Sequence, residues 1–167
     1  NKDYIKSNNP ATILDLEKNK IYLDNFEYST SENFFQSSGN IKVVDSKDNQ
    51  YNFSQIFIDE KKKEIVGTDS KAFLNQEGFK TNKNNKPRVF SNTVNMQENK
   101  TIFTKSVFTL CDYRKEDKCP PWSLQAKQML HDQKKKTIFY DNAVIKVYDF
   151  PILYFPRLSH PDPTVDR

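Results

Sequence analysis

Histidines and carboxylates are the first side chains to consider for chemistry, and they are sparsely arranged. The chain of 167 residues contains two histidines, His131 and His160, and Asp132 directly follows the first. Neither histidine has further ligands at a spacing that would complete a metal centre, so we expect no bound metal. We expect Asp132 to begin a turn instead and to bond nearby backbone groups.

Motifs of known catalytic sites are missing from the sequence. With 3 glycines, the chain has no Gly-x-Ser-x-Gly elbow, no phosphate-binding P-loop and no glycine-rich dinucleotide turn. The paired carboxylates Asp59 and Glu60 precede three lysines, and such mixed charges are usually solvated. We therefore expect neither enzymatic activity nor a cofactor.

The two cysteines leave more than one interpretation open. Cys111 and Cys119 flank the segment DYRKEDK, which is not the spacing of a CxxC redox or zinc motif. In an oxidising compartment they could form a short disulfide, worth about 2–3 kcal/mol on the loop-entropy model. In the cytosol they would be ordinary thiols, and composition alone does not decide between the two.

Composition indicates a folded, polar chain. Apolar residues make up 35%, and 13 Phe and 8 Tyr supply bulky core material. The net charge of +4 comes from dispersed lysines, as on solvated strand faces. The aromatic residues follow strand patterns and not a basic stripe, so we expect no nucleic-acid binding. The chain begins at Asn1 and not at a methionine, so we expect the sequence to belong to a processed or trimmed protein.

Alternation of apolar and polar residues is the main structural signal. Trp122, Leu124 and Ala126 alternate with polar residues, which predicts a strand with one buried face. Ala143, Ile145 and Val147 form a second such set. Further strands are predicted at residues 41–44, 51–58, 64–74, 88–96, 101–110 and 151–155. We predict no helix, and we expect residues 127–132 to open into a turn. Many short strands with polar turns predict an all-β sandwich, roll or barrel.

Short phrases recur along the chain. Residues 100–103 and 136–139 share the letters KTIF, and residues 20–25 resemble residues 137–142. We expect each phrase to be a strand, followed in two cases by an Asp-Asn turn. Because a pair of strands cannot bury its apolar face alone, such units must stack and share a core. A stack leaves two open edges that invite docking by another β-domain.

Residues 119–167 carry a specific family resemblance. The stretch contains PWSLQA from Pro121, HD from His131, TIFY from Thr137, NA from Asn142, PI from Pro151 and HPDP from His160. In this order they resemble the end of the N-terminal domain of the LptD (organic-solvent-tolerance) family. Residues 35–43, FQSSGNIKV, resemble the weaker OstA-type repeat that this family shares with LptA. Residues 1–34 match loosely.

The resemblance implies an open β-jellyroll, or β-taco, of stacked antiparallel strands, which we expect over residues 1–167 as a single domain. It implies a place in the periplasm at the outer membrane. There the domain would receive lipopolysaccharide from an LptA-like bridge and pass its acyl chains to an outer-membrane barrel. The chain stops soon after His160 to Pro163, where the barrel should begin, so we expect an excised domain. The resemblance leaves an LptE-like lipoprotein partner open.

The cysteines depart from the family pattern. Better-known members join this domain to the barrel by long-range disulfides, whereas Cys111 and Cys119 are close enough to pair with each other. We favour the local pair. The alternative is that one or both cysteines pair with the absent part.

The alternation also selects residues that would line a lipid groove. They are Trp122, Leu124, Ala126, Ala143, Ile145 and Val147, to which we add Ile138 and Phe103. Any one of them could equally be an ordinary core residue. Ala126 and Ala143 suggest a groove most, because small inward residues leave volume that a closed core would fill. The alternatives are a free-standing LptA-like bridge and a carbohydrate-binding β-sandwich, which would expose aromatic residues on a flat face.

Overall fold

The protein is all-β, as the alternation predicts. The computed structural model describes residues 3–14, 18–46, 48–74, 87–110 and 121–161, which form strands and no helix. Within these ranges, no helix is long and apolar enough to cross a membrane. The strands are β1 (Tyr4–Ser7), β2 (Ala11–Leu14), β3 (Lys20–Leu23), β4 (Phe26–Ser29), β5 (Phe34–Val44), β6 (Gln50–Asp59), β7 (Glu64–Phe73), β8 (Arg88–Gln97), β9 (Lys100–Thr109), β10 (Trp122–Asp132), β11 (Thr137–Val147) and β12 (Phe150–Pro161).

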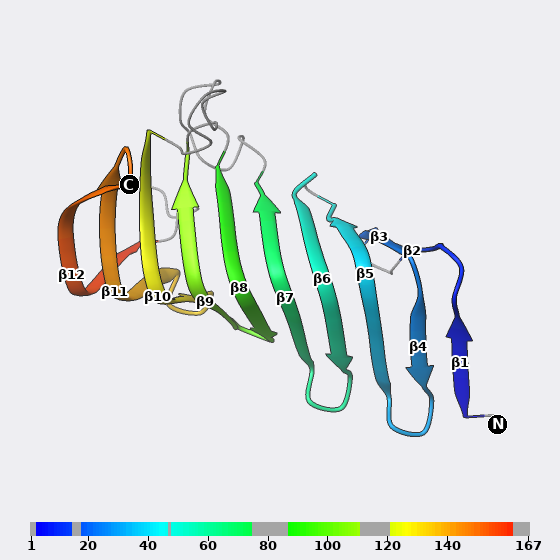
Figure 1. Ribbon diagram of the computed structural model, residues 1–167. Coiled ribbons are helices and arrows are strands. Elements are labelled where there is room, and N and C mark those ends of the chain that lie inside the picture. The colour runs from blue at the N-terminus through cyan, green and yellow to red at the C-terminus, as the bar shows by residue number, and fades with distance from the viewer. Residues whose placement is uncertain (1–2, 15–17, 47, 75–86, 111–120, 162–167) are drawn as a thin grey trace.

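The strands form a single open antiparallel sheet. From β5 to β12 each strand pairs with the next along the chain, and the sheet does not close into a barrel (Figure 1). At the N-terminal end β3 and β4 both pair with β5, β2 pairs with β3, and β1 pairs with β4. At this edge each full-length strand is therefore replaced by two short strands: β3 and β4 lie beside β5, and β2 and β1 lie beyond them. The opposite edge is β12, which contains Pro151, Pro156 and Pro161.

Each long strand is interrupted near its middle along a line that we call the crease. The regular cross-strand pairing skips one position there, or two in β5 and in both strands of the β6–β7 pair. Alternate strands place a residue with positive φ on this line: Gly39 at 105°, Asp69 at 49°, Lys105 at 50° and Asn142 at 51°. This conformation is uncommon outside glycine and is more readily adopted by Asp and Asn. The crease runs through Asp24–Asn25, Gly39–Asn40, Ser54, Asp69, Asn92, Lys105, Lys127, Asn142 and Pro156.

The crease divides the sheet into two halves that face each other. The lower half ends in the turns at residues 30–33, 60–63, 98–99 and 133–136, and the upper half ends in the turns at 45–49 and 148–149. One buried cluster contains Leu124 of the upper half and Met129 of the lower half, both from β10. A second cluster joins Phe53 and Ile56, on either side of the crease in β6. The faces turned toward each other form what we call the inner face.

Alternation changes phase where the strands cross the crease. In β10 the inner residues are Leu124 and Ala126, and the next is Met129, a step of three instead of two. The same step of three separates the residue pairs 23/26, 53/56, 67/70, 91/94, 103/106, 140/143 and 155/158. Without this step, the half-strand beyond the crease would turn its apolar residues outward.

Large and small side chains complement each other across the crease. Along the upper side, Ser70, Ser91, Ser106, Ala126 and Ala143 are successive cross-strand neighbours. Along the lower side, the neighbours are Val94, Phe103, Met129, Tyr140 and Leu158. In β6 and β7 the complementary pair runs diagonally, because the ring of Phe53 on the upper side of β6 lies over Gly67 on the lower side of β7. The bottom of the fold is therefore filled by the protein's own side chains.

The lower turns share one hydrogen-bonding device. Asp132 Oδ1 accepts from the backbone N–H of Lys135 at 3.0 Å, and Asp59 Oδ1 accepts in the same way from Lys62 at 3.0 Å. Ser29 Oγ occupies the equivalent position in the turn before β5. The prediction that Asp132 begins a turn and bonds nearby backbone is confirmed.

Two local predictions were wrong. Residues 127–132 do not open into a turn but continue β10 to Asp132, and the three-residue step after Ala126 hid this continuity. Asp141-Asn142 does not follow a strand as a turn but lies within β11 on the crease. Asp24-Asn25 follows β3, as expected, and forms the bend that leads into β4. The KTIF phrases also differ in register, since Thr101 lies on the inner face and Thr137 on the outer face.

The Phe53–Gly67 contact predicts a position that cannot accept a side chain. A Cβ at residue 67 would lie 2.6 Å from Phe53 Cδ1 and 3.1 Å from Val94 Cγ1. We expect Gly67→Ala to lower the free energy of unfolding by about 1–3 kcal/mol, measured by urea denaturation. Adding Phe53→Leu should recover part of that loss. Thr68→Ala, on the outer face, is the control, and an unchanged Gly67→Ala variant would contradict this packing.

Candidate functional site

Above the buried bottom, the inner face has two walls made of cross-strand neighbours. The upper wall consists of Val43, Tyr51, Ala72, Val89, Phe108, Leu124, Ile145 and Leu153. The lower wall consists of Phe35, Ile58, Ile65, Met96, Thr101, His131, Ile138 and His160. Eleven of these sixteen residues are Val, Leu, Ile, Ala or Phe, and the other five are Tyr51, Met96, Thr101, His131 and His160.

Exposure increases from the crease into the lower wall, whereas Ala72, Val89 and Leu124 of the upper wall are still buried. Ala143, beside the crease, is 0% exposed, and Val94 across it is 1% exposed. All residues of the lower wall are half-buried. At the C-terminal end of the upper wall, Leu153 is 52% exposed. The walls therefore leave apolar surface uncovered although the bottom is packed.

All eight residues predicted to line a groove lie on the inner face, but at different depths. Ala126, Ala143 and Phe103 border the crease, and Leu124, Ile145 and Ile138 belong to the walls. Trp122 and Val147 pair with each other above the upper wall, and the Trp122 ring meets Phe108 edge-on at 6.1 Å between centroids. Contact of these residues with lipid stays a prediction.

The volume expected beside Ala126 and Ala143 is occupied. Both alanines belong to one buried cluster with Met129 and Tyr140, which come from the lower side of the crease. The small residues therefore accommodate larger partners of the same protein and do not by themselves open a groove. Leu124, one row further out, is also buried, and partly uncovered apolar residues nearby are Ile145 of the upper wall and Ile138 of the lower wall.

The alternation missed most of the lower wall. Phe35, Ile58, Ile65 and Met96 form the apolar part of the wall from β5 to β8, and they pack against the second cluster, which contains Phe53 and Ile56. In β6, Phe53 and Ile58 lie on the same face although they are an odd number of residues apart. Searching for inner residues separated by three, with two polar residues between them, would have found these positions.

The lower wall becomes polar toward β12. His160 Nε2 is 2.9 Å from the hydroxyl of Tyr140, and His160 Nδ1 is 2.7 Å from the carbonyl oxygen of Pro161. The Tyr140 and His160 rings lie 5.5 Å apart. His131 occupies the same row on β10, with Ile138 between the two histidines. The wall is therefore not uniform along its length.

The outer face also carries aromatic residues, but in separate pairs. Phe34 and Phe57 stack at 6.4 Å between centroids, and Phe73 and Phe90 meet edge-on at 6.4 Å. Polar neighbours such as Lys71 lie between or beside these pairs. Aromatic residues thus occur on both faces. The outer face of the lower half also carries an apolar row, which Asn95 interrupts: Phe57 and Val66, then Ile102, Leu130 and Phe139. The inner face is distinguished by its two opposed walls on either side of the packed crease.

The described residues contain no group of three or more His, Cys, Asp or Glu side chains that could hold a metal. Cys111 and Cys119, predicted as a disulfide pair, lie outside the described residues. No protein-family model matches the chain, and no curated protein matches it. A proposal about function therefore has to be argued from the inner face.

The buried Tyr140 predicts a dependence of stability on alkaline pH. Burial raises the pKa of its phenol to about 12 in the folded protein, whereas an unfolded tyrosine ionises near pH 10. Its stabilising contribution is fully present below about pH 10 and is lost as the pH rises toward 12. We expect the free energy of unfolding to fall over this window, and to fall less steeply in Tyr140→Phe. Tyr22→Phe, on the outer face, is the control. Equal slopes in wild type and Tyr140→Phe would contradict the assignment.

Proposed function

We propose that this chain is a non-enzymatic lipid-transfer domain that carries lipopolysaccharide by its acyl chains along the inner face. The observation that carries the proposal is the open sheet, folded at a packed crease, with two largely apolar walls on its inner face. Ala72, Val89 and Leu124 of the upper wall are buried, whereas the apolar residues of the lower wall are half-buried and Leu153 is exposed. Folding brings the two walls opposite each other without joining their edges. Acyl chains could lie against the walls while attached sugars stay in water.

The energetics of acyl burial suit such a shape. Each buried methylene contributes about 0.8 kcal/mol, so a chain of about twelve carbons gains on the order of 10 kcal/mol. A deep closed cavity would therefore hold the lipid too tightly for transfer. The upper wall, which presents an apolar or aromatic residue on each strand from β5 to β12, could offer contact to acyl chains at successive positions. Lipid could then move along them without one dominant binding site.

The cellular setting of the proposal comes from the resemblance of residues 119–167 to the LptD family. In this setting the domain lies at the periplasmic face of the outer membrane and receives lipopolysaccharide from an LptA-like bridge. Docking by strand pairing requires unpaired backbone, which β1 and β2 supply at one edge and β12 at the other. An outer-membrane barrel, with or without an LptE-like lipoprotein, would accept the lipid.

Neighbouring residues that face opposite ways provide a test. Ile145 lies on the upper wall and Val144 on the outer face of the same strand. Met96 and Asn95 are the corresponding pair on the lower half. A photo-crosslinking amino acid is placed at each position in turn, and the irradiated protein is probed for attached lipopolysaccharide.

We expect lipopolysaccharide to be captured at residues 145 and 96 but only at background level at residues 144 and 95. The outer positions control for non-specific contact with micelles, since their exposure is comparable. Capture that is equal on the two faces, or limited to residues 144 and 95, would refute the proposed route. The folded state of each variant is checked by its far-ultraviolet circular dichroism.

A further inference from the structure

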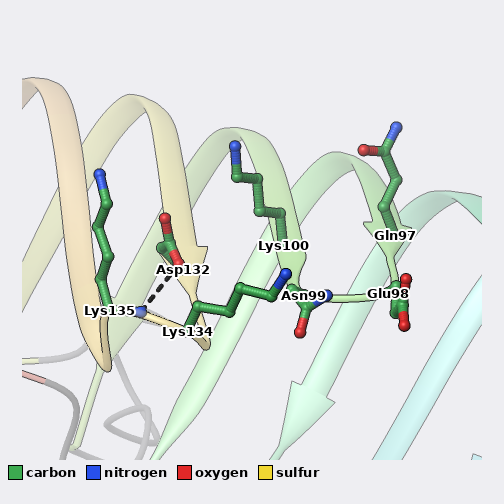
Figure 2. Close-up of a pocket in the computed structure, with 7 residues that line it drawn as sticks. All are labelled: Gln97, Glu98, Asn99, Lys100, Asp132, Lys134 and Lys135. Atoms are coloured by element: carbon green, nitrogen blue, oxygen red, sulfur yellow. Dashed lines mark hydrogen bonds between the residues drawn. The ribbon is translucent and has the colours of Figure 1, made fainter.

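Two neighbouring turns of the lower half form a lysine-lined cradle on the outer face. The β8–β9 turn contributes Asn99 and, just after it, Lys100, while the β10–β11 turn contributes Lys134 and Lys135 (Figure 2). The backbone N–H of Gln133 donates to the carbonyl oxygen of Asn99 at 2.9 Å. This bond holds the two turns side by side.

Asp132 organises the cradle and does not cover it. Asp132 lies opposite Lys100 in the β9–β10 pairing and is 5% exposed. One of its carboxylate oxygens accepts from the backbone N–H of Lys135. The three lysines are exposed, and Figure 2 shows Lys134 extending across the cradle toward Asn99. Glu98, next to Asn99, is the exposed carboxylate of the lining. Three exposed lysines against this one carboxylate leave the charge presented to solvent positive.

A second turn of the same construction shows what the cradle lacks. In the β6–β7 turn, Asp59 caps the turn as Asp132 does, and Lys62 Nζ lies 2.9 Å from Asp59 Oδ2. In the β10–β11 turn, the equivalent Lys135 extends over the ring of Phe139, 5.8 Å from its centroid. No ion pair among the described residues joins Lys100, Lys134 or Lys135 to a carboxylate.

We infer that the cradle binds a phosphate group. Three lysines and one exposed carboxylate, Glu98, line the same hollow, and a multiply charged oxyanion would balance the excess positive charge. Lysine binds phosphate as a point charge and does not require the planar geometry that arginine offers. Asn99 and Gln97 add side-chain amides that can donate further hydrogen bonds. The phosphate could be free in solution or carried on the headgroup of an amphiphile, and the chemistry of recognition is the same.

The test follows backbone amide resonances of the ¹⁵N-labelled protein by NMR during titration with inorganic phosphate. We expect saturable shifts at Asn99, Lys100 and residues 133–136. The cradle variant, K100Q/K134Q/K135Q, should weaken the apparent affinity about tenfold or more, since each exposed charge contributes on the order of 0.5 kcal/mol. The turn-matched variant, K61Q/K62Q/K63Q, removes the same charge from the β6–β7 turn and should change the affinity by less than about twofold.

Equal weakening in both variants, or shifts spread over every lysine-containing turn, would overturn the inference, because they would show general charge screening. A second titration compares dodecyl phosphate with dodecyl maltoside to identify the source of the phosphate. Tighter binding of dodecyl phosphate than of inorganic phosphate, with shifts in the cradle, would support a headgroup. Equal binding would support free phosphate.

The same titration keeps this inference separate from the proposed lipid route. Both amphiphiles should shift inner-face resonances such as those of Met96 and Ile145 if acyl chains bind there. Inner-face shifts without a phosphate-dependent response in the cradle would overturn the cradle alone. Cradle shifts with inorganic phosphate, but no inner-face response to either amphiphile, would support the cradle and count against the lipid route.

Discussion

Apolar side chains must stay on one face of each strand after that strand has crossed the crease. Strict alternation of inward and outward residues does not meet this requirement in a bent strand. One unpaired residue at the bend moves every side chain beyond it to the opposite face of the sheet. The three-residue step corrects the phase, as between Ala126 and Met129. The packed bottom, the opposed walls and the open seam all follow from repeating this correction from strand to strand.

Much of the sheet could be predicted from alternation because each half-strand obeys it. The segment from Trp122 to Ala126 and the segment from Ala143 to Val147 were placed on the correct face, since neither crosses the crease. The predicted strands at residues 64–74 and 88–96 agree closely with β7 and β8. The all-β class followed from these signals and from the polar turns.

The rest depended on contacts between distant parts of the chain. No local pattern shows that Tyr140 would fill the space beside Ala143, because that requires the fold at the crease. Likewise, Asp141-Asn142 has the residue preferences of a turn, yet cross-strand pairing on both sides keeps it within β11. The lysine cradle was missed because its two turns are far apart in sequence and meet through the hydrogen bond between Gln133 and Asn99.

The construction of the two sheet edges limits uncontrolled self-association. Long, flat, unpaired strands are templates on which further copies can add and form fibrils. Here one edge consists of β1 and β2, each four residues long, and the other carries Pro151, Pro156 and Pro161, which lack the N–H group needed to donate. A copy approaching either edge would find only short stretches of continuous pairing. The row of strands can therefore stay unclosed while both of its edges disfavour the stepwise addition of further copies.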